Sequence, residues 1–537
     1  MDKAQLHQLF CQDIHTFLKH RADMKVPLLG LKEVDMTGLE FTNLEIGQVT
    51  LDKINFANCT FKNCKFDIIT FTRCTFDGAV FDGCEFTAMN FSGVNLRNAR
   101  FNVVAFQKCL LNDTDFSKKE LKKVVFIESN LQGSSFSGAV LKECVVQRCN
   151  VMNAQWVGTQ FIDVIIEGLE FVEADFNMCL FLSCRFREGK FRDCQLGSSK
   201  FDQCSFENVE LPGLDFSGKK LTGLAFAGCK LDDVHFQESL LEKLTLADCS
   251  IKRAKLNGAV LTKVTLVGLD FSTLPIKGLA LKDCTVKDVD FSGCNLESSR
   301  FEGTPLDGVC FEGAVLASAQ CVSGSLTNCN FHGAVVTNAN FTASTFTGAT
   351  MTEADFSGTN LSNATLSGAT LTGCSFADAN LEQAGLAGCK LAGVKLEGAK
   401  LEGANIREAD LAGAVLRQTA LKGTDLSGLD LTGMDLSGAT LEGVSLRDSS
   451  VVNAHFDGAT FVEVDITGTA IEGASFKSAT VANHDFSGKK LNGVDFSGAS
   501  LSNCNFDGCD FDGSLFQHAD LRNANFFVAN YPDANFK

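Results

Sequence analysis

The strongest constraint on this chain is an apolar residue at every fifth position. From Leu31 to Phe536, all 102 residues whose numbers end in 1 or 6 are apolar, and no insertion or deletion breaks the count. A period of five fits neither the 3.6 residues per turn of an α-helix nor the two-residue repeat of a straight strand. Each unit must therefore be a short extended piece followed by a change of direction. Such self-similarity indicates a repeat array rather than several globular domains.

The other positions of the five-residue unit are equally selective. Two residues before each centre the side chain is mostly small, and 20 of the 23 cysteines lie there. Two residues after the centre lie 42 of the 48 glycines. Period-two alternation places the centre and the small residue before it on the same side, so we expect both to point inward. Glycine is expected to relieve the steric cost of a corner, and four corners close a coil.

The residues resemble a known family. The units ANLEQ, ADLAG, TDLSG and LDLTG are similar to the A(D/N)LXX signature of pentapeptide-repeat proteins, and the resemblance covers about 95% of the chain. It implies an all-β fold, a right-handed quadrilateral β-helix with four pentapeptides in each coil. The 102 units then correspond to about 25 coils. Residues 20 apart should stack one coil above the other.

We expect three segments along the chain. Residues 1–25 lack the repeat, and their apolar residues fall on one side of a short amphipathic α-helix that is expected to cap the solenoid. Residues 26–300 are expected to form a Phe/Cys-rich part, and residues 301–537 an acidic Leu/Ala-rich part that continues it in one solenoid, with two subdomains as the alternative. The net charge of −18 is uneven, with −3 in residues 1–300 and −15 in residues 301–537. The C-terminal end has no helix of its own, so a partner or a second copy is expected to cover it.

The composition also limits the setting and the chemistry. Twenty-three cysteines without a signal peptide indicate a reduced cytoplasmic protein, and no stretch is apolar enough to predict a membrane span. The cysteines and eight histidines show no metal-ligand spacing, and no catalytic motif is present. We therefore expect no enzyme activity, no cofactor and no direct nucleic-acid binding.

Four charged or imidazole residues interrupt the inward column of small side chains: Lys119, Lys219, His484 and Lys489. Each lysine belongs to a recurring phrase, DFSKKEL or DFSGKKL. An unpaired ammonium group inside the coil would be costly, so each lysine is expected either to leave through a widened corner or to pair with the aspartate of its phrase. A local bulge is the favoured interpretation, and a binding site is the alternative.

One outward row carries carboxylates, with Asp425, Asp465 and Asp485 on the same face. A solvated surface is the simple interpretation, and a candidate acidic interaction face is the sharper one. Asp465 and Asp485 lie on adjacent rungs, where like charges repel.

Two functions from different classes follow. The first is a non-enzymatic, rod-shaped scaffold or adaptor for protein partners, which the resemblance links to bacterial secretion systems or effectors. The second is a DNA mimic, because some members of the family bind DNA gyrase through a DNA-like surface; the acidic residues 301–537 suit it. A mimic needs a continuous acidic stripe, whereas a scaffold does not.

Overall fold

The fold is known from a computed structural model that describes residues 31–33, 35–96, 98–272, 274 and 276–537. The expected capping helix of residues 1–25 lies outside the described residues. The chain forms two compact units, unit 1 up to Lys255 and unit 2 from Leu256 to Lys537. The predicted boundary near residue 300 concerned composition, and it stays a prediction.

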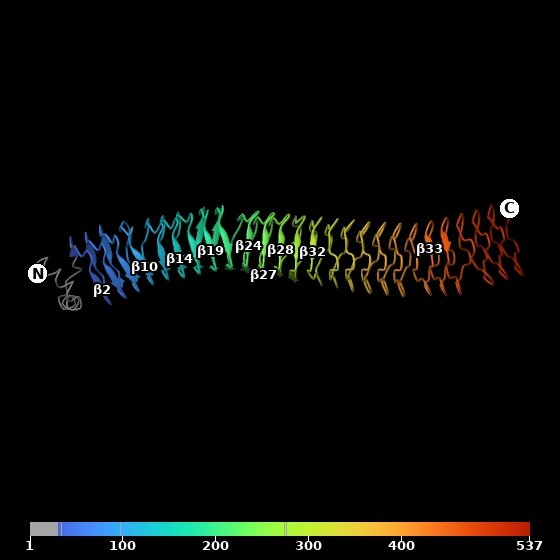
Figure 1. Cartoon of the computed structure of the whole chain (residues 1–537), viewed down its shortest axis with the longest axis horizontal. Helices are drawn as coiled ribbons and strands as arrows, with labels where there is room; N and C mark the ends of the chain where they lie inside the picture. Colours follow the sequence, from blue (N-terminus) through green and yellow to red (C-terminus); the bar gives the residue numbers. More distant parts are fainter. Residues whose placement is uncertain (1–30, 34, 97, 273, 275) are drawn as a thin grey trace. The chain divides into compact units, whose positions relative to one another are not determined.

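Each unit is a parallel β-solenoid whose turn takes 20 residues. Residue i pairs with residue i+20, from Leu31 with Leu51 in unit 1 to Leu515 with Asn535 in unit 2. Four five-residue sides therefore make one turn, and we number them by their central residues: side 1 includes residue 41, side 2 residue 46, side 3 residue 51 and side 4 residue 56. Figure 1 shows the strands of each unit stacked as successive rungs. The all-β solenoid and its 20-residue coil were predicted correctly.

In unit 1, sides 1 and 2 carry one three-residue strand in every turn. The strands of side 1 are β2 (Glu40–Thr42), β5 (Thr60–Lys62), β8 (Val80–Asp82), β10 (Arg100–Asn102), β12 (Glu120–Lys122), β14 (Val140–Lys142), β16 (Gln160–Ile162), β19 (Leu180–Leu182), β22 (Lys200–Asp202), β24 (Lys220–Thr222) and β26 (Leu240–Glu242). The strands of side 2 are β3 (Glu45–Gly47), β6 (Lys65–Asp67), β9 (Glu85–Thr87), β11 (Ala105–Gln107), β13 (Val125–Ile127), β15 (Val145–Gln147), β17 (Ile165–Glu167), β20 (Arg185–Arg187), β23 (Ser205–Glu207), β25 (Ala225–Ala227) and β27 (Thr245–Ala247).

Side 3 of unit 1 has fewer strands, and unit 2 has few on any side. Side 3 contains β1 (Leu31–Lys32), β4 (Thr50–Asp52), β7 (Thr70–Thr72), β18 (Glu170–Val172) and β21 (Lys190–Arg192). Unit 2 contains β28 (Val260–Thr262), β29 (Thr265–Val267), β30 (Ala280–Lys282), β31 (Thr285–Lys287), β32 (Arg300–Glu302), β33 (Thr440–Glu442) and β34 (Thr460–Val462). Elsewhere single β-bridges continue the same parallel register. Each unit therefore keeps the register in which residue i pairs with residue i+20.

The core consists of the two inward columns. Phenylalanine rings stack from rung to rung, with centroid distances of 4.9 Å between Phe41 and Phe61 and 5.0 Å between Phe61 and Phe81. In unit 2 the centres are often leucine and the second column is often alanine, as at Leu401 and Ala399, which are both buried. The inward assignment of the central and small residues is confirmed.

Nearly all corners that the structure describes use a left-handed backbone, and at one of them Gly197 adopts it in place of Ser198. All 42 glycines that lie two residues after a central residue have positive φ. Other residue types adopt the same conformation there, including β-branched Val103 (φ 52°) and Ile68 (φ 51°), although such residues rarely do so. The corner N–H donates to a carbonyl of the next coil, as Gly158 N does to Asn177 O at 2.9 Å. Hydrogen bonding to the next rung thus holds the corner even where glycine is absent.

Candidate functional site

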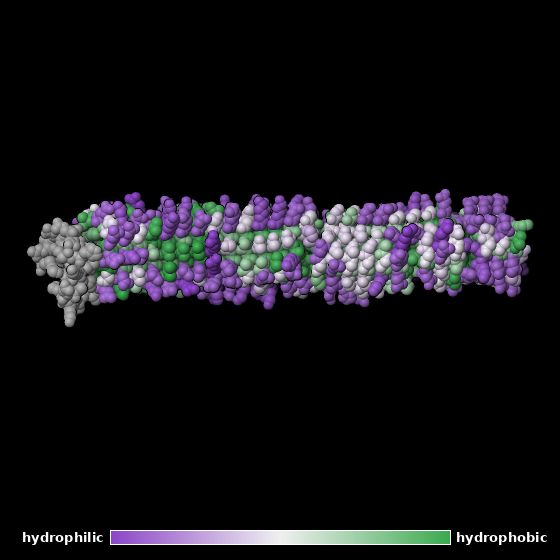
Figure 2. Space-filling view, turned by 90° about the horizontal axis from the view of Figure 1, so that it is seen from below, coloured by the Kyte–Doolittle hydropathy of each residue, from purple (hydrophilic) through white to green (hydrophobic). Residues whose placement is uncertain are grey.

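The charged side chains of unit 1 largely neutralise one another between rungs. Lys65 and Glu85 lie 3.3 Å apart, and Lys123 and Glu143 lie 3.5 Å apart, each pair joining adjacent coils. Figure 2 shows hydrophilic side chains along the edges of the viewed surface and paler or hydrophobic residues along its middle. Each exposed pair adds little stability, about 0–1 kcal/mol. These pairs reduce the electrostatic potential that a binding partner would meet at the surface of unit 1.

The candidate acidic face is also compensated. Arg407 donates to Asp425 Oδ2 at 2.6 Å, and Arg447 lies 3.3 Å from Asp465 Oδ2. Asp485 Oδ1 accepts from the Asn505 amide at 3.0 Å. Carboxylates therefore alternate with guanidinium and amide groups along this face.

Each of these aspartates is also anchored in its own turn. The Oδ1 atoms of Asp425, Asp465 and Asp485 accept the backbone N–H two residues further on, at 2.9–3.0 Å. Hydrogen bonds from Ser427 and then from Arg407 hold the pKa of Asp425 below its usual value. Hydrogen bonds from Thr467 and Ser487 likewise lower the pKa of Asp465 and Asp485. All three are held as carboxylates that stabilise corners.

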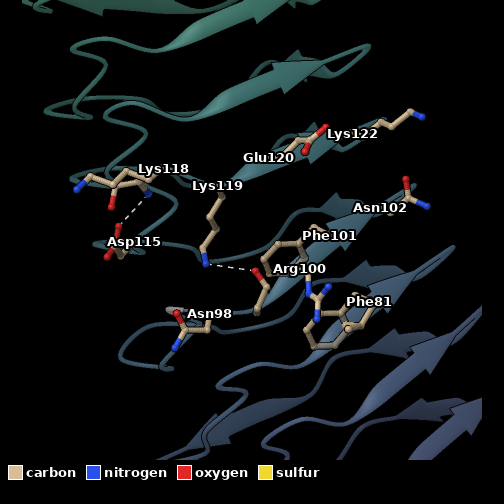
Figure 3. A pocket seen from close by; sticks show the side chains of 13 residues that line it. Phe81, Asn98, Arg100, Phe101, Asn102, Asp115, Lys118, Lys119, Glu120 and Lys122 are labelled. Carbon is tan, nitrogen blue, oxygen red and sulfur yellow. Dashed lines mark hydrogen bonds between the residues drawn. The ribbon is translucent and has the colours of Figure 1, made fainter.

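Lys119 lies in the inward column and is 9% exposed. Its Nζ donates to the Ala99 carbonyl of the preceding coil at 3.2 Å, and Figure 3 shows the side chain directed down to that oxygen. Burial lowers the pKa of Lys119, while the charges of Asp115 and Asp77 raise it. The lysine thus uses a backbone carbonyl that normally belongs to the β-ladder.

The ladder is shorter at this point. In the step above, the Val140 N–H donates to the Lys119 carbonyl at 2.8 Å, and the step below has the equivalent bond from Arg100 to Ala79. Strands β10 and β12 pair through two residues each, against three residues in the steps on either side. The large side chain therefore coincides with a shortened ladder at this rung, and the expected bulge stays a prediction.

The other two lysines also donate to backbone carbonyls of the coil below, Lys489 to the residue 20 positions earlier and Lys219 to the residue 22 positions earlier. Lys219 Nζ donates to the Gly197 carbonyl, and β22 pairs with β24 through Asp202 and Thr222 alone. Lys489 Nζ donates to the Thr469 carbonyl at 3.1 Å. Among the described residues no bridge joins Ala470 to Lys490, although bridges continue on both sides of that step. The recurring phrase is thus a repeated interruption of the ladder.

His484 interrupts the β-ladder between two further coils, on side 2. The Val464 N–H donates to its Nε2 at 3.3 Å, and its Nδ1 lies 3.2 Å from the Ala482 carbonyl. The ring is buried and burial lowers its pKa, so the neutral form with a proton on Nδ1 fits both contacts. Asp465 and Asp485 flank this step, which brings the acidic row and the His484 interruption together.

Two of these interruptions border hollows in the surface. The hollow beside His484 has a volume of about 480 Å³, and its lining residues are Phe461, Val462, Glu463, Val464, Thr480, Ala482, Asn483, His484 and Asp485. The hollow beside Lys119 has a volume of about 680 Å³. Its lining residues are Val80, Phe81, Asn98, Ala99, Arg100, Phe101, Asn102, Asp115, Ser117, Lys118, Lys119, Glu120 and Lys122. Both hollows arise where a large residue replaces a small one in the inward column.

The cysteine column has a role beyond filling space. Cys64 Sγ lies 3.4 Å from the Phe41 carbonyl and Cys144 Sγ lies 3.2 Å from the Leu121 carbonyl, both in the coil below. The Thr159 hydroxyl makes the same bond to Phe136 at 2.7 Å. The column therefore favours small donors, a preference that the sequence shows as its mixture of Cys, Ser and Thr. All cysteines that the structure describes are free thiols.

Within the described ranges, no group of three or more His, Cys, Asp or Glu residues is arranged to hold a metal ion. No helix among those residues is long and apolar enough to cross a bilayer. The last turn exposes Phe527, Val528 and Tyr531, at 71%, 73% and 56%. Its coverage by a partner or a second copy stays a prediction.

Comparison with known families gives repeated matches. A model described as a pentapeptide repeat region matches residues 34–104, 199–272 and 324–406. A second model, described as pentapeptide repeats (8 copies), matches residues 105–142, 120–155, 280–319, 404–443, 441–477 and 490–526. Together they cover most of the chain. A search of curated proteins gave no match.

Several solved structures are similar to parts of the chain. HetL, a pentapeptide repeat protein involved in heterocyst differentiation regulation from Nostoc sp. strain PCC 7120, is 20% identical over 41% of this chain and 90% of its own, with a TM-score of 0.31. QnrB1, a plasmid-mediated fluoroquinolone resistance protein, is 15% identical over 46% of this chain and 90% of its own, with a TM-score of 0.17. Rfr23 from Cyanothece 51142 is 17% identical over 36% and 90%, with a TM-score of 0.13. Likenesses this distant have no bearing on function.

Proposed function

Because the chain belongs to the pentapeptide-repeat family, we propose that it is a non-enzymatic scaffold or adaptor that presents its solenoid sides to protein partners. The matched family models describe repeats and not a catalytic domain. The outward positions are rigidly spaced by the 20-residue register, so side chains on one side keep fixed separations of about 4.8 Å per rung. Such a surface suits recognition by another folded protein. Its link to bacterial secretion machinery is a finer prediction from the resemblance, and its place in the cytoplasm is a finer prediction from the cysteine content and the N-terminal sequence.

The observation that supports a scaffold over a DNA mimic is the pairing of acidic residues in unit 2. Arg407 and Arg447 approach Asp425 and Asp465, and further pairs join Arg417 to Asp435, Lys422 to Glu442 and Lys477 to Asp495. A DNA-like surface needs an unbroken row of negative charges, since the phosphate backbone carries one at each nucleotide. Alternating signs weaken such a field within a Debye length of about 8 Å.

The DNA mimic remains the second candidate because residues 301–537 still carry a net charge of −15. A supercoiling assay with DNA gyrase and the full chain separates the two functions. We expect no inhibition at 50–200 mM salt, and capture of a protein partner from a native extract by the immobilised chain. A different result, namely potent inhibition that the substitutions Asp425→Lys, Asp465→Lys and Asp485→Lys abolish, would establish the mimic.

A matched triple on side 3, Asp410→Lys with Asp430→Lys and Asp512→Lys, controls for the change in net charge. These residues carry the same charge as the candidate acidic face and lie on a different side of the coil. If both triples abolish inhibition equally, total charge decides and the row on side 2 has no special role.

A further inference from the structure

The hollow beside Lys119 differs from the surrounding surface of unit 1 in its charge. Four cations line it, Arg100, Lys118, Lys119 and Lys122, against the two carboxylates of Asp115 and Glu120. Its lining therefore carries a net charge of four minus two, or +2. Several other lysines of unit 1 lie next to a carboxylate of the adjacent coil, as Lys62 does to Glu40 at 2.6 Å.

Three of these cations are exposed and lack such a partner. Among the described residues, Arg100, Lys118 and Lys122 form no ion pair within 4.0 Å. In Figure 3, Lys118 lies on one side of the hollow, whereas Arg100 and Lys122 lie on the other side, on β10 and β12. The positive charges thus border the hollow from both sides of one corner.

The hollow lies where the ladder between β10 and β12 is incomplete. Because Lys119 Nζ takes the Ala99 carbonyl, β10 and β12 pair only from Phe101 and Leu121 onward. The polar side chains of Asn98, Asn102 and Ser117 complete the lining. A volume of about 680 Å³ lies within the range of pockets that hold small ligands, about 300–1,000 Å³, so it can hold a few residues of an extended peptide.

We propose that this hollow binds a short acidic segment of a protein partner, whose carboxylates meet Arg100 and Lys122 on one side of the corner and Lys118 on the other. The proposal rests on the scaffold function and names the chemistry of the partner. A peptide fits better than a nucleic acid, because Asp115 and Glu120 leave only a local excess of two positive charges, whereas a strand of phosphates extends over many nucleotides. The amides of Asn98 and Asn102 already donate to Asp77 Oδ1 at 2.5 Å and to Asp82 Oδ1 at 2.6 Å, so each keeps one N–H for a ligand. These two N–H groups and the Ser117 hydroxyl can donate hydrogen bonds to carboxylate oxygens of the peptide.

The test is a fluorescence-anisotropy titration of the full chain with a labelled 12-residue peptide of alternating Glu and Ser. A Gln/Ser peptide and a labelled dT12 oligonucleotide serve as comparison ligands. We expect the acidic peptide to bind, the Gln/Ser peptide not to bind, and affinity to fall as salt rises from 50 to 200 mM. Tighter binding of the oligonucleotide than of the acidic peptide would overturn the assignment to a peptide.

A matched pair of triple variants locates the site. Arg100→Gln with Lys118→Gln and Lys122→Gln removes the exposed cations of the hollow, and Gln suits the corner of Lys118, since Gln48 and Gln203 adopt left-handed φ at equivalent corners. The control triple, Lys62→Gln with Lys108→Gln and Arg187→Gln, makes the same charge change at cations that have carboxylate partners.

We expect the hollow triple to lose about ten-fold in affinity, or about 1.4 kcal/mol, and the control triple less than about two-fold. Thermal melting of both proteins establishes that they are folded. Equal losses in the two triples would mean that total charge binds the peptide, and would overturn the site. Failure of the wild type to bind the peptide, with capture of a protein partner intact, would overturn the hollow and leave the scaffold function standing.

Discussion

Replacement of Lys119 by alanine should stabilise unit 1, although it removes a hydrogen-bonded side chain from the core. The same inward column carries Ala79, Ala99 and Ala139 at the neighbouring turns, so alanine fits this position. Without the lysine, the Glu120 N–H can donate to the Ala99 carbonyl, as the Val140 N–H does to the Lys119 carbonyl one step above. The ladder between β10 and β12 would then be complete.

The gain can be worked from three contributions. A restored backbone hydrogen bond contributes about 0.5–1.5 kcal/mol, and release of an ordered lysine side chain contributes about 1.5–2 kcal/mol. Loss of the charged bond to Ala99 costs about 1.5–3 kcal/mol, less the cost of burying the ammonium group that the change also removes. The expected net gain is about 1 kcal/mol, or about 3 °C in melting temperature for a unit of this size.

The gain should depend on pH in a defined direction. Burial lowers the pKa of Lys119 below 10.5, so at neutral pH the unfolded state binds this proton more tightly than the folded state. That cost to folding is full below the folded pKa and disappears above 10.5. The advantage of Lys119→Ala is therefore largest near pH 7 and shrinks in alkaline solution.

Thermal melting and hydrogen exchange of the full chain measure these effects. We expect a higher melting temperature and slower exchange of the Glu120 amide, while Lys118→Ala, an exposed corner change, should alter stability by less than about 0.5 kcal/mol. A lower melting temperature together with faster exchange around residue 120 would refute the reasoning, since it would mean that Lys119 closes this rung rather than opening it.

Two further predictions concern the core. Phe181→Ala should lower the free energy of unfolding by about 3–5 kcal/mol, because the ring is 1% exposed and stacks on Phe161 at 4.7 Å and Phe201 at 4.6 Å. Asp465→Ala should lower it by about 0.5 kcal/mol or less. Similar urea midpoints for the two variants would contradict the inward assignment. Burial raises the pKa of Cys144 to about 11 from 9.0. The protonated thiol therefore contributes to the free energy of unfolding in full below pH 9, and this contribution is lost as pH rises toward 11. Its size is about 1.4 kcal/mol per unit of pKa difference. Thiol labelling should therefore be slow at pH 8 until urea is added, and labelling of the native protein as fast as that of the unfolded protein would be the contrary result.

The regular part of this fold could be predicted from the sequence because one rule, an inward residue every five positions, applies throughout. Phe41, Phe61 and Phe81 follow from that rule, as does their stacking at 20-residue spacing. The position of Lys119 as an exception was equally visible. Its contact was not, because the expected partners were solvent or an aspartate, and the lysine instead reaches a carbonyl that the ladder normally uses.

The acidic face shows the other limit. Asp425 and Asp465 were correctly placed on one side, but Arg407 and Arg447 precede them by 18 residues rather than 20. Such a pair joins an outward residue of one rung to a different outward position on the next, so it depends on side-chain conformations as well as on the register. The sequence marked Lys119 as an exception, but the lining of the hollow beside it was missed for a similar reason, since the repeat pattern does not reveal which outward side chains border one step of the ladder.

The 20-residue register also determines how such a chain can change in length during evolution. Insertion of a single residue would turn every later inward side chain outward. Insertion of five residues would keep the core but rotate all later surface residues by a quarter turn, so that residues formerly aligned on one side would be divided between two. Only duplications or deletions of 20 residues preserve both the core and the alignment of surface groups. Genes that encode such a solenoid should therefore gain and lose sequence in multiples of 60 nucleotides wherever a binding surface spans several turns.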